Sequence, residues 1–316
     1  MRMEYGRLGR TGLEVSLVSL GTGGPSRFGQ DRGTTPAAAR RLVRRALDHG
    51  VNLFDTAQDY GDSEALLGQA LDGVPRDAYL IATKCTYRDA DERVIAATDV
   101  SHAIDRALAR LKVDVIDVMQ IHGLMDEHYD EVIARHLPVL EDAQAAGKIR
   151  FIGVTERFTH DPAHVMLRRA IADDHFDTLM VGYSLLHQGA ERHVLPAAQV
   201  ADIGVIIMIA VRRALSIPER LREVIADLVA RGQLPADAVP ADDPLGWLVH
   251  GDVTSVVEAA YRFVREHPAV DTVLTGTSRP EHLDDNVAAL LRGILPAADQ
   301  QRLRDIFGHL EEALGN

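Results

Sequence analysis

The sequence has almost no cysteine, since Cys85 is the single one among 316 residues. An intrachain disulfide is therefore impossible, which excludes a disulfide-stapled scaffold and favours a reducing compartment. The fourteen histidines show no metal-ligand spacing such as H-E-x-x-H, so we expect no metal site. Cys85 directly follows Lys84, which leaves two interpretations open: a small buried filler, or a thiol made reactive by the neighbouring ammonium.

Long hydrophobic runs and an excess of positive charge are also missing. The longest apolar runs, such as VIIMIAV at 205–211, are far shorter than the roughly 20 residues that span a bilayer. The N-terminal MRMEYGRLGRTGLEV is polar and lacks the apolar region of a signal peptide. A formal charge of −13 argues against nucleic acid or an anionic membrane as the main partner. We expect a cytoplasmic protein that holds any anionic ligand with local positive groups.

What the sequence does contain is a repeated pattern, a short β-branched run followed by an amphipathic helical stretch. Hydrophobic residues make up 46% of the chain, enough to bury a core without disulfides or metals. Eight runs predict strands, at 16–20, 51–54, 79–83, 115–121, 150–154, 177–183, 204–209 and 271–276. Helices are predicted at 36–48, 63–71, 98–110, 130–146, 162–171, 192–200, near 218–230 and 253–267, at 280–291 and after 296.

Eight alternating β and α units in this length favour a closed (β/α)8 TIM barrel, a single domain over residues 1–316. Extra helices are expected before the eighth strand and at the C-terminus. A doubly wound open sheet is the alternative, and it usually carries G-x-G-x-x-G after its first strand. GTGG at 21–24 gives half of that fingerprint, but Pro25 and a polar loop follow where a helix would begin. The opening YGRLGRTGLEVS predicts a β-hairpin that plugs the N-terminal end of the barrel.

Four side chains of complementary chemistry stand at three consecutive predicted strand ends. Asp55 ends the second strand and Tyr60 follows in its loop. Lys84 ends the third strand, and His122 ends the fourth. Each alone has an ordinary explanation, such as a turn cap, a half-buried aromatic, a solvated cation or a core histidine. Because active sites of such barrels lie at the shared C-terminal strand ends, the four together favour a reaction centre.

These groups suit proton donation to an oxygen while a hydride reaches the adjacent carbon. A tyrosine titrates near 10 in water, and a cationic Lys84 nearby favours the phenolate of Tyr60 and lowers its pKa. Asp55 keeps the ammonium charged, and His122 can orient a carbonyl oxygen by hydrogen bonding. None of the four supplies a hydride, so a nicotinamide cofactor is implied.

At this point the sequence resembles the aldo-keto reductase family over essentially its whole length. The matching segments are GVNLFDTAQDYGDSEALLGQAL, IATK, DVIDVMQIH, AAGKIRFIGVT and VLTGTSRPEHLDDNVAAL. By this resemblance Tyr60 is the general acid/base and Lys84 lowers its pKa. Asp55 then supports Lys84, and His122 positions the substrate carbonyl. The family implies a (β/α)8 barrel that binds NADPH, less often NADH, and a small-molecule carbonyl or alcohol as partner.

Around the expected nicotinamide the chain departs from the family pattern. Thr155 and Glu156 stand where members carry Ser-Asn for the carboxamide, and a carboxylate cannot donate as an amide does. Met180 replaces a frequent glutamine. Tyr183 matches the aromatic residue on which the nicotinamide ring stacks in the family.

At the other end, GTSRPEHLDDN resembles the family's adenosine-phosphate clamp at a helix N-terminus. Arg279, without a nearby diol-binding acid, favours the 2′-phosphate of NADPH, and NADH is not excluded. Arg212 and Arg213 replace the usual PLxxG and suit the pyrophosphate, an anionic substrate group or a solvated loop. The expected cofactor contacts are Thr22, Thr155, Glu156, Met180, Tyr183, Arg212, Arg213, Gly276, Thr277, Ser278, Arg279, His282, Asp285 and Asn286.

Three functional hypotheses follow from these residues. The first is an NADPH-dependent oxidoreductase acting on an aldehyde, ketone or sugar carbonyl; an aromatic content of only 5% favours a polar substrate. The second, motivated by the departures at Glu156 and Met180, is a catalytically weak or inactive NADP(H)-binding regulatory barrel. The third is a Schiff-base aldolase or lyase using a neutral Lys84, which an adjacent Asp55 opposes by holding the ammonium charged.

Overall fold

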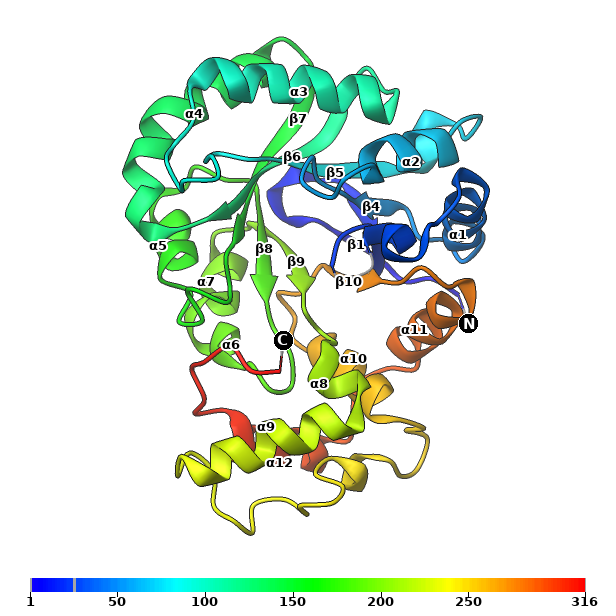
Figure 1. The fold of residues 1–316 in the computed structure, drawn as a ribbon, viewed down its shortest axis with the longest axis vertical. Coiled ribbons are helices and arrows are strands. Elements are labelled where there is room, and N and C mark those ends of the chain that lie inside the picture. Colours follow the sequence, from blue (N-terminus) through cyan, green and yellow to red (C-terminus); the bar gives the residue numbers. More distant parts are fainter. Residues whose placement is uncertain (1, 25–26, 316) are drawn as a thin grey trace.

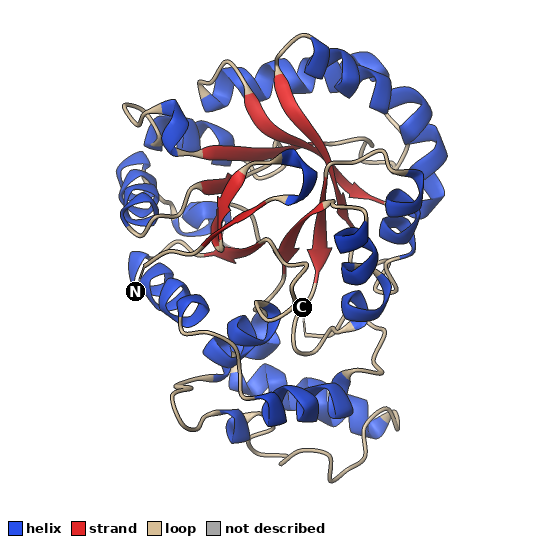
Figure 2. Cartoon of the chain, turned by 180° about the vertical axis from the view of Figure 1, so that it is seen from behind, coloured by secondary structure: helices blue, strands red, loops and turns tan. Residues whose placement is uncertain are grey.

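Eight parallel strands close into a barrel in the order β10-β3-β4-β5-β6-β7-β8-β9 (Figures 1 and 2). The structure is a computed structural model that describes residues 2–24 and 27–315, so Pro25 lies outside the described residues. Parallel pairing of β10 with β3 closes the ring, which confirms the barrel and makes the open-sheet alternative wrong. The strands are β3 Val18–Gly21, β4 Leu53–Asp55, β5 Leu80–Cys85, β6 Ile116–Leu124, β7 Ile149–Glu156, β8 Thr178–Gly182, β9 Gly204–Met208 and β10 Thr272–Gly276.

Helices surround the barrel, and the extra ones predicted before the last strand and at the C-terminus are present. The predicted helix over 192–200 is divided in two, because Pro196 has no N–H to continue the first segment and instead occupies the start of the second. The terminal helix ends before Gly308 rather than running to the chain end. The helices are α1 Pro36–Asp48, α2 Ser63–Ala70, α3 Ala97–Leu111, α4 Tyr129–Ala145, α5 Val165–Asp173, α6 Gly189–His193, α7 Leu195–Val200, α8 Arg213–Ser216, α9 Pro218–Ala230, α10 Val256–Val264, α11 Pro280–Leu291 and α12 Ala297–Phe307.

Helix α1 shows how local sequence places these elements. The Thr35 side chain accepts a hydrogen bond from the Ala38 amide, and Pro36 begins the helix, where its missing N–H costs nothing. The apolar residues Ala39, Leu42, Val43 and Ala46 recur at helical spacing and are all buried, while the arginines between them face outward. The amphipathic pattern therefore fixes which side of α1 packs on the barrel.

The N-terminal hairpin consists of β1 Tyr5–Arg7 and β2 Glu14–Ser16, which pair antiparallel. Its apolar residues join side chains from inside the barrel in one cluster: Leu8, Leu13, Val15, Leu53, Ala82, Val118, Met180 and Ile206. A methyl group on Gly204, the first residue of β9, would lie 2.8 Å from Leu8. The hairpin thus plugs the N-terminal end of the barrel, as predicted, and leaves the opposite end for a site.

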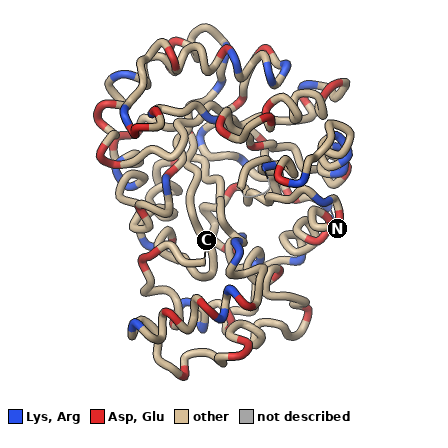
Figure 3. The backbone as a smooth tube through the Cα atoms, viewed as in Figure 1, with Lys and Arg blue, Asp and Glu red and all other residues tan. Residues whose placement is uncertain are grey.

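The long segment between β9 and β10 carries α8, α9 and α10, and with α12 it forms a helical layer at one side of the barrel (Figure 1). Basic and acidic residues are interspersed over the outer helices (Figure 3). Among the described residues, no helix is long and apolar enough to cross a membrane.

Candidate active site

A buried ion pair lies at the C-terminal ends of β4 and β5. The Lys84 ammonium is 2.5 Å from Asp55 Oδ1 and donates to the Thr56 carbonyl oxygen at 2.8 Å. Gln120 lies on β6, paired with Lys84 of β5, and its side chain donates to Asp55 Oδ2 at 3.2 Å. Both charges are almost inaccessible to water, with 2% exposure for Lys84 and 3% for Asp55. Loss of either partner would therefore strongly destabilise the fold, because it would leave the other charge buried and unpaired.

This pairing keeps Lys84 charged. Burial by itself lowers the pKa of Lys84, but the Asp55 carboxylate and the Tyr60 phenol together outweigh it, so the pKa lies above its ordinary value. A Schiff-base mechanism needs a neutral amine. The geometry therefore disfavours Lys84 as a nucleophile and favours it as a fixed cation.

Tyr60 stands over this cation at the mouth of the barrel. The Lys84 ammonium lies 5.0 Å from the Tyr60 ring centroid, and the His122 ring meets Tyr60 edge-on at 5.6 Å between centroids. Burial raises the pKa of Tyr60 above its ordinary value, while the charge of Lys84 acts to lower it. The sequence predicts the second effect but not that burial is the larger of the two in this structure. Tyr60 is consequently protonated at neutral pH, the state that a proton donor requires.

Gly23 lies in the loop that follows β3 and leaves room for the Tyr60 ring. A Cβ atom at this position would lie only 2.4 Å from Tyr60 Cε2 and 2.6 Å from Cζ. Any larger residue must displace either the loop or the ring. The glycine-rich GTGG stretch thus serves the site by a close backbone approach rather than as half of a dinucleotide fingerprint.

We expect Gly23→Ala to lower carbonyl turnover by about 100-fold, because displacement of a reacting group by about 1 Å costs that much. The control is Gly21→Ala, whose methyl group meets nothing closer than Leu274 at 3.7 Å and should be tolerated. Steady-state kinetics on both variants checks this. Equal activity of the two variants would contradict the packing argument.

Asp59 is a site residue to which the sequence assigned no role. Its Oδ2 lies 3.2 Å from His122 Nδ1 and accepts a hydrogen bond from Thr86 Oγ1 at 2.6 Å. The hydrogen bond from His122 is the main reason that the pKa of Asp59 lies below its usual value. In the sequence, only the position of Asp59 next to Tyr60 suggested a role in the site. That position does not determine the direction of the Asp59 side chain.

A cavity of about 1260 Å³ runs from the four residues Asp55, Tyr60, Lys84 and His122, called the tetrad below, to the N-terminus of α11. The tetrad contributes Asp55 and Tyr60 to its wall. Residues that the sequence missed include Gly23, Arg32 and Thr254. The predicted cofactor residues that line the cavity are Met180, Arg212, Arg213, Gly276, Thr277, Ser278, Arg279, His282, Asp285 and Asn286. Residues near the start of the chain and residues near its end thus line the same elongated cavity.

The other four predicted cofactor residues do not line the cavity, and three of them are held by protein contacts. Thr22 is fully buried, and its hydroxyl has no hydrogen-bond partner among the described residues, whereas Thr155 Oγ1 accepts a hydrogen bond from the Gly123 amide at 2.7 Å. Tyr183 is also fully buried, packs against Phe263 and donates its hydroxyl to Glu191. In this arrangement Tyr183 presents no open face for a nicotinamide ring, so its stacking role stays a prediction.

Glu156, the fourth, belongs to a buried carboxylate–imidazole pair. Its Oε2 lies 2.8 Å from His164 Nδ1, and its Oε1 accepts the Gly182 amide at 2.6 Å. Burial raises the pKa of Glu156, and the hydrogen bond from His164 opposes that rise. The pair ties the end of β7 to the end of β8. Glu156 therefore has a structural role that the sequence did not predict.

Three guanidinium groups on the cavity wall stand without a carboxylate partner in the part of the chain that the structure describes: Arg212, Arg213 and Arg279. By contrast Arg292, on the same wall, lies 2.8 Å from Glu258. Burial lowers the pKa of Arg212, which is half-buried after β9. Unpaired cations in a strongly acidic protein suit phosphate or carboxylate groups of a ligand.

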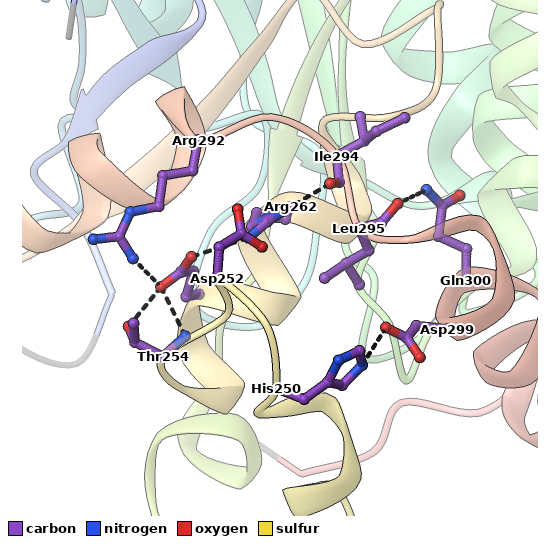
Figure 4. Close-up of polar contacts among 10 residues, drawn as sticks. His250, Asp252, Thr254, Arg262, Arg292, Ile294, Leu295, Asp299 and Gln300 are labelled. Carbon is purple, nitrogen blue, oxygen red and sulfur yellow. Dashed lines mark hydrogen bonds and ion pairs between the residues drawn. The ribbon is translucent and has the colours of Figure 1, made fainter.

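The Glu258 carboxylate joins several donors in an ionic network at the far end of the cavity; Figure 4 labels its partners Thr254, Arg262 and Arg292. The carboxylate accepts hydrogen bonds from Thr254 Oγ1 at 2.6 Å, Arg292 at 2.8 Å and Arg262 at 3.2 Å. Arg262 also donates to the Ile294 carbonyl oxygen at 2.9 Å and so links α10 to the segment after α11. Thr254, Arg262 and Arg292 thus all donate to the Glu258 carboxylate.

Cys85 is buried beside the tetrad and points away from solvent. Its exposure is 2%, and burial raises the pKa of its thiol to about 12. A thiol that stays protonated is a poor nucleophile, so the structure supports the filler interpretation.

Comparison with known proteins decides the family. The Aldo/keto reductase family model matches residues 19–307. The chain belongs to the aldo-keto reductase family. This aldo-keto reductase is accordingly an NAD(P)H-dependent oxidoreductase.

Named relatives agree with that assignment, and a solved structure has the same fold. The chain is 28% identical over 329 residues to L-galactose dehydrogenase of Arabidopsis thaliana, covering 98% of this aldo-keto reductase and 95% of that protein. It is 40% identical over 169 residues to 6-dehydroglucose reductase of Novosphingobium aromaticivorans, covering 50% and 52% of the two chains. An aldo-keto reductase from Klebsiella pneumoniae in complex with NADPH has the same fold, with a TM-score of 0.70 and 23% identity over 99% of both chains.

Proposed function

We propose that this enzyme catalyses NADPH-dependent reduction of an aldehyde, ketone or sugar carbonyl, or the reverse oxidation. The observation that carries the proposal is Tyr60 held above the buried Lys84–Asp55 pair, with His122 at its edge. NADPH supplies the hydride when bound. Tyr60 donates its hydroxyl proton to the carbonyl oxygen as the hydride adds to carbon. The fixed charge of Lys84 stabilises the phenolate that remains, and solvent then returns the proton.

The residues present fit the phosphate-bearing part of NADPH. Thr277, Ser278 and Arg279 precede α11, where backbone amides and the helix dipole favour an anion. Thr277 Oγ1 accepts the Arg279 amide at 3.0 Å and shapes this turn. Arg279 would hold the 2′-phosphate, and Arg212 or Arg213 the pyrophosphate or an anionic substrate group.

We expect Arg279→Ala to weaken NADPH binding by about 30-fold and NADH binding much less, since a charge-assisted hydrogen bond contributes about 2 kcal/mol. Isothermal titration calorimetry with each cofactor measures both affinities. The charge-matched control is Arg40→Ala on the exposed side of α1. A uniform loss for both cofactors would contradict the assignment of Arg279 to the 2′-phosphate.

A sugar or other hydroxylated carbonyl is the proposed substrate class. The relatives named for L-galactose and 6-dehydroglucose act on sugars, and the chain has few aromatic residues for an apolar pocket. The test follows NADPH consumption with aldoses, oxidised sugars and simple aldehydes at matched concentrations. Turnover confined to simple apolar aldehydes would exclude a sugar preference.

A second candidate is the NADP(H)-binding regulatory barrel without useful turnover. It is favoured by the commitment of Thr155, Glu156 and Tyr183 to protein contacts, away from the cavity. It predicts tight NADPH binding in calorimetry together with no consumption of NADPH by any carbonyl tested. The intact tetrad makes the oxidoreductase the stronger proposal.

A further inference from the structure

The second nitrogen of His122 faces a carboxylate rather than solvent. His122 Nδ1 lies 3.2 Å from Asp59 Oδ2. The same oxygen is held by Thr86 Oγ1 at 2.6 Å, which orients the carboxylate from the neighbouring strand exit. An ionised carboxylate accepts hydrogen bonds and donates none. Nδ1 must therefore carry the proton whenever the His122–Asp59 contact is made.

This constraint decides what Nε2 can do. In neutral His122 the single ring proton is on Nδ1, so Nε2 has a lone pair and accepts a hydrogen bond from a hydroxyl group. In the imidazolium form both nitrogens carry protons, and Nε2 donates to a carbonyl oxygen. The two forms consequently suit opposite halves of a reversible carbonyl–alcohol reaction.

We propose that Asp59 is a positioning residue that fixes the Nδ1-protonated tautomer of His122, so that the imidazolium form assists carbonyl reduction and the neutral form assists alcohol oxidation. The inference rests on the proposed oxidoreductase function for its kinetic part. Asp59 does not touch the reacting atoms; it acts through the orientation and charge of the His122 ring. Hydride and proton transfer remain as described for the cofactor and Tyr60.

Several charges act on His122 from the surrounding elements. Burial lowers its pKa, Asp59 raises it, and Lys84 on β5 lowers it again, while Asp55 on β4 raises it. On the β7 side, Arg157 lies 3.2 Å from Glu92, a carboxylate that it shares with Arg88, and Arg88 also acts on Asp59. Asp59 is thus the hydrogen-bonded group that opposes burial. Removing its charge shifts the pKa of His122 further downward.

The experiment is the pH profile of kcat/KM for reduction and for oxidation in wild type, Asp59→Asn and Asp62→Asn. Asp62 is the matched control, because it lies three residues on in the same loop, is exposed and makes no side-chain cap bond. In Asp59→Asn we expect alcohol oxidation at neutral pH to fall about tenfold, because neutral His122 then carries its proton on Nε2 and offers the alcohol no lone pair. The reduction profile becomes flatter with pH, since Nε2 then donates to the carbonyl oxygen in both ring forms. The changes are in kcat/KM for the carbonyl and the alcohol, and NADPH affinity stays unchanged.

A spectroscopic measurement tests the tautomer without turnover. Nitrogen-15 NMR of the imidazole rings, assigned with a His122→Gln variant, should show protonated Nδ1 and unprotonated Nε2 in neutral wild-type enzyme. Asp59→Asn should redistribute the proton toward Nε2, because an amide can donate to Nδ1. Thr86→Val should give an intermediate result, since it removes the hydroxyl that orients the Asp59 carboxylate and leaves the carboxylate itself in place.

The proposal is overturned by an Nε2-protonated neutral His122 in wild type, or by Asp59→Asn profiles for reduction and oxidation that are unchanged or lowered equally at every pH. A uniform loss would mark a purely structural role. If wild type reduces no carbonyl, the proposed function fails, and the NMR result still supports or overturns the tautomer assignment by itself.

Discussion

Replacing Tyr60 with phenylalanine is expected to abolish carbonyl reduction, with a loss of at least about 1000-fold, within the range for a lost general acid. The variant keeps the ring that packs against Gly23 and His122, so the cavity retains its shape. It removes the phenol hydroxyl that lies beside the Lys84–Asp55 pair. Cofactor affinity should stay within about twofold, because the phosphate-binding residues lie at the other end of the cavity.

Stopped-flow kinetics and calorimetry on the same preparations separate chemistry from binding. The control is Tyr79→Phe, which removes a phenol outside the cavity whose hydroxyl makes no hydrogen bond within residues 2–24 and 27–315. If Tyr60→Phe kept full turnover, proton donation from Tyr60 would be wrong. If wild type bound NADPH without turnover on any carbonyl, the regulatory barrel would replace the oxidoreductase proposal.

Replacing Glu156 with alanine is expected to lower the free energy of unfolding by about 4 kcal/mol, since each of two buried groups left without its hydrogen-bond partner costs about 1–3 kcal/mol. The change leaves His164 Nδ1 and the Gly182 amide without their acceptor, at positions that exclude water. It also cuts the connection between the ends of β7 and β8 beside the site. Urea unfolding at constant m-value measures the loss.

A double-mutant cycle sharpens this test. The variants are Glu156→Ala, His164→Ala and both together; direct partners should show a coupling of about 1–3 kcal/mol. Glu156→Gln is the conservative control, because the amide keeps one acceptor oxygen for Gly182. If the effects of the two single substitutions on the free energy of unfolding simply added, a direct interaction between Glu156 and His164 would be contradicted. Tighter NADPH binding by Glu156→Gln would instead indicate that residue 156 reaches the carboxamide.

Much of the fold was predictable because barrels repeat a local pattern. Each β-branched run must be buried on both faces, and each amphipathic helix must cover it, so eight repeats left few architectures open. The Asp55, Tyr60, Lys84 and His122 set was predictable for a related reason. Strand ends in a parallel barrel share one face, which turns positions in sequence into neighbours in space. The extension of one domain over 1–316 stays a prediction.

The less accurate predictions concern where side chains point once packed. Glu156 and Tyr183 occupy the expected strand ends, but they turn into the protein to reach His164, Gly182 and Glu191. The sequence also predicted a lowered Tyr60 pKa from the Lys84 charge alone. Burial was missing from that estimate, because it depends on every residue that surrounds the ring.

The sequence by itself determined the barrel, the four tetrad residues and the helix N-terminus that favours a phosphate, because each follows from local pattern and strand order. Only the tertiary structure decided the roles of Asp59 and Glu156. Both are carboxylates near strand ends, and nothing in their spacing distinguishes them. Asp59 lies at the exposed mouth and reaches His122 and Thr86, whereas Glu156 is sealed against His164. Solvent exposure and the identity of the partner set the function of a charged group, and long-range packing sets both.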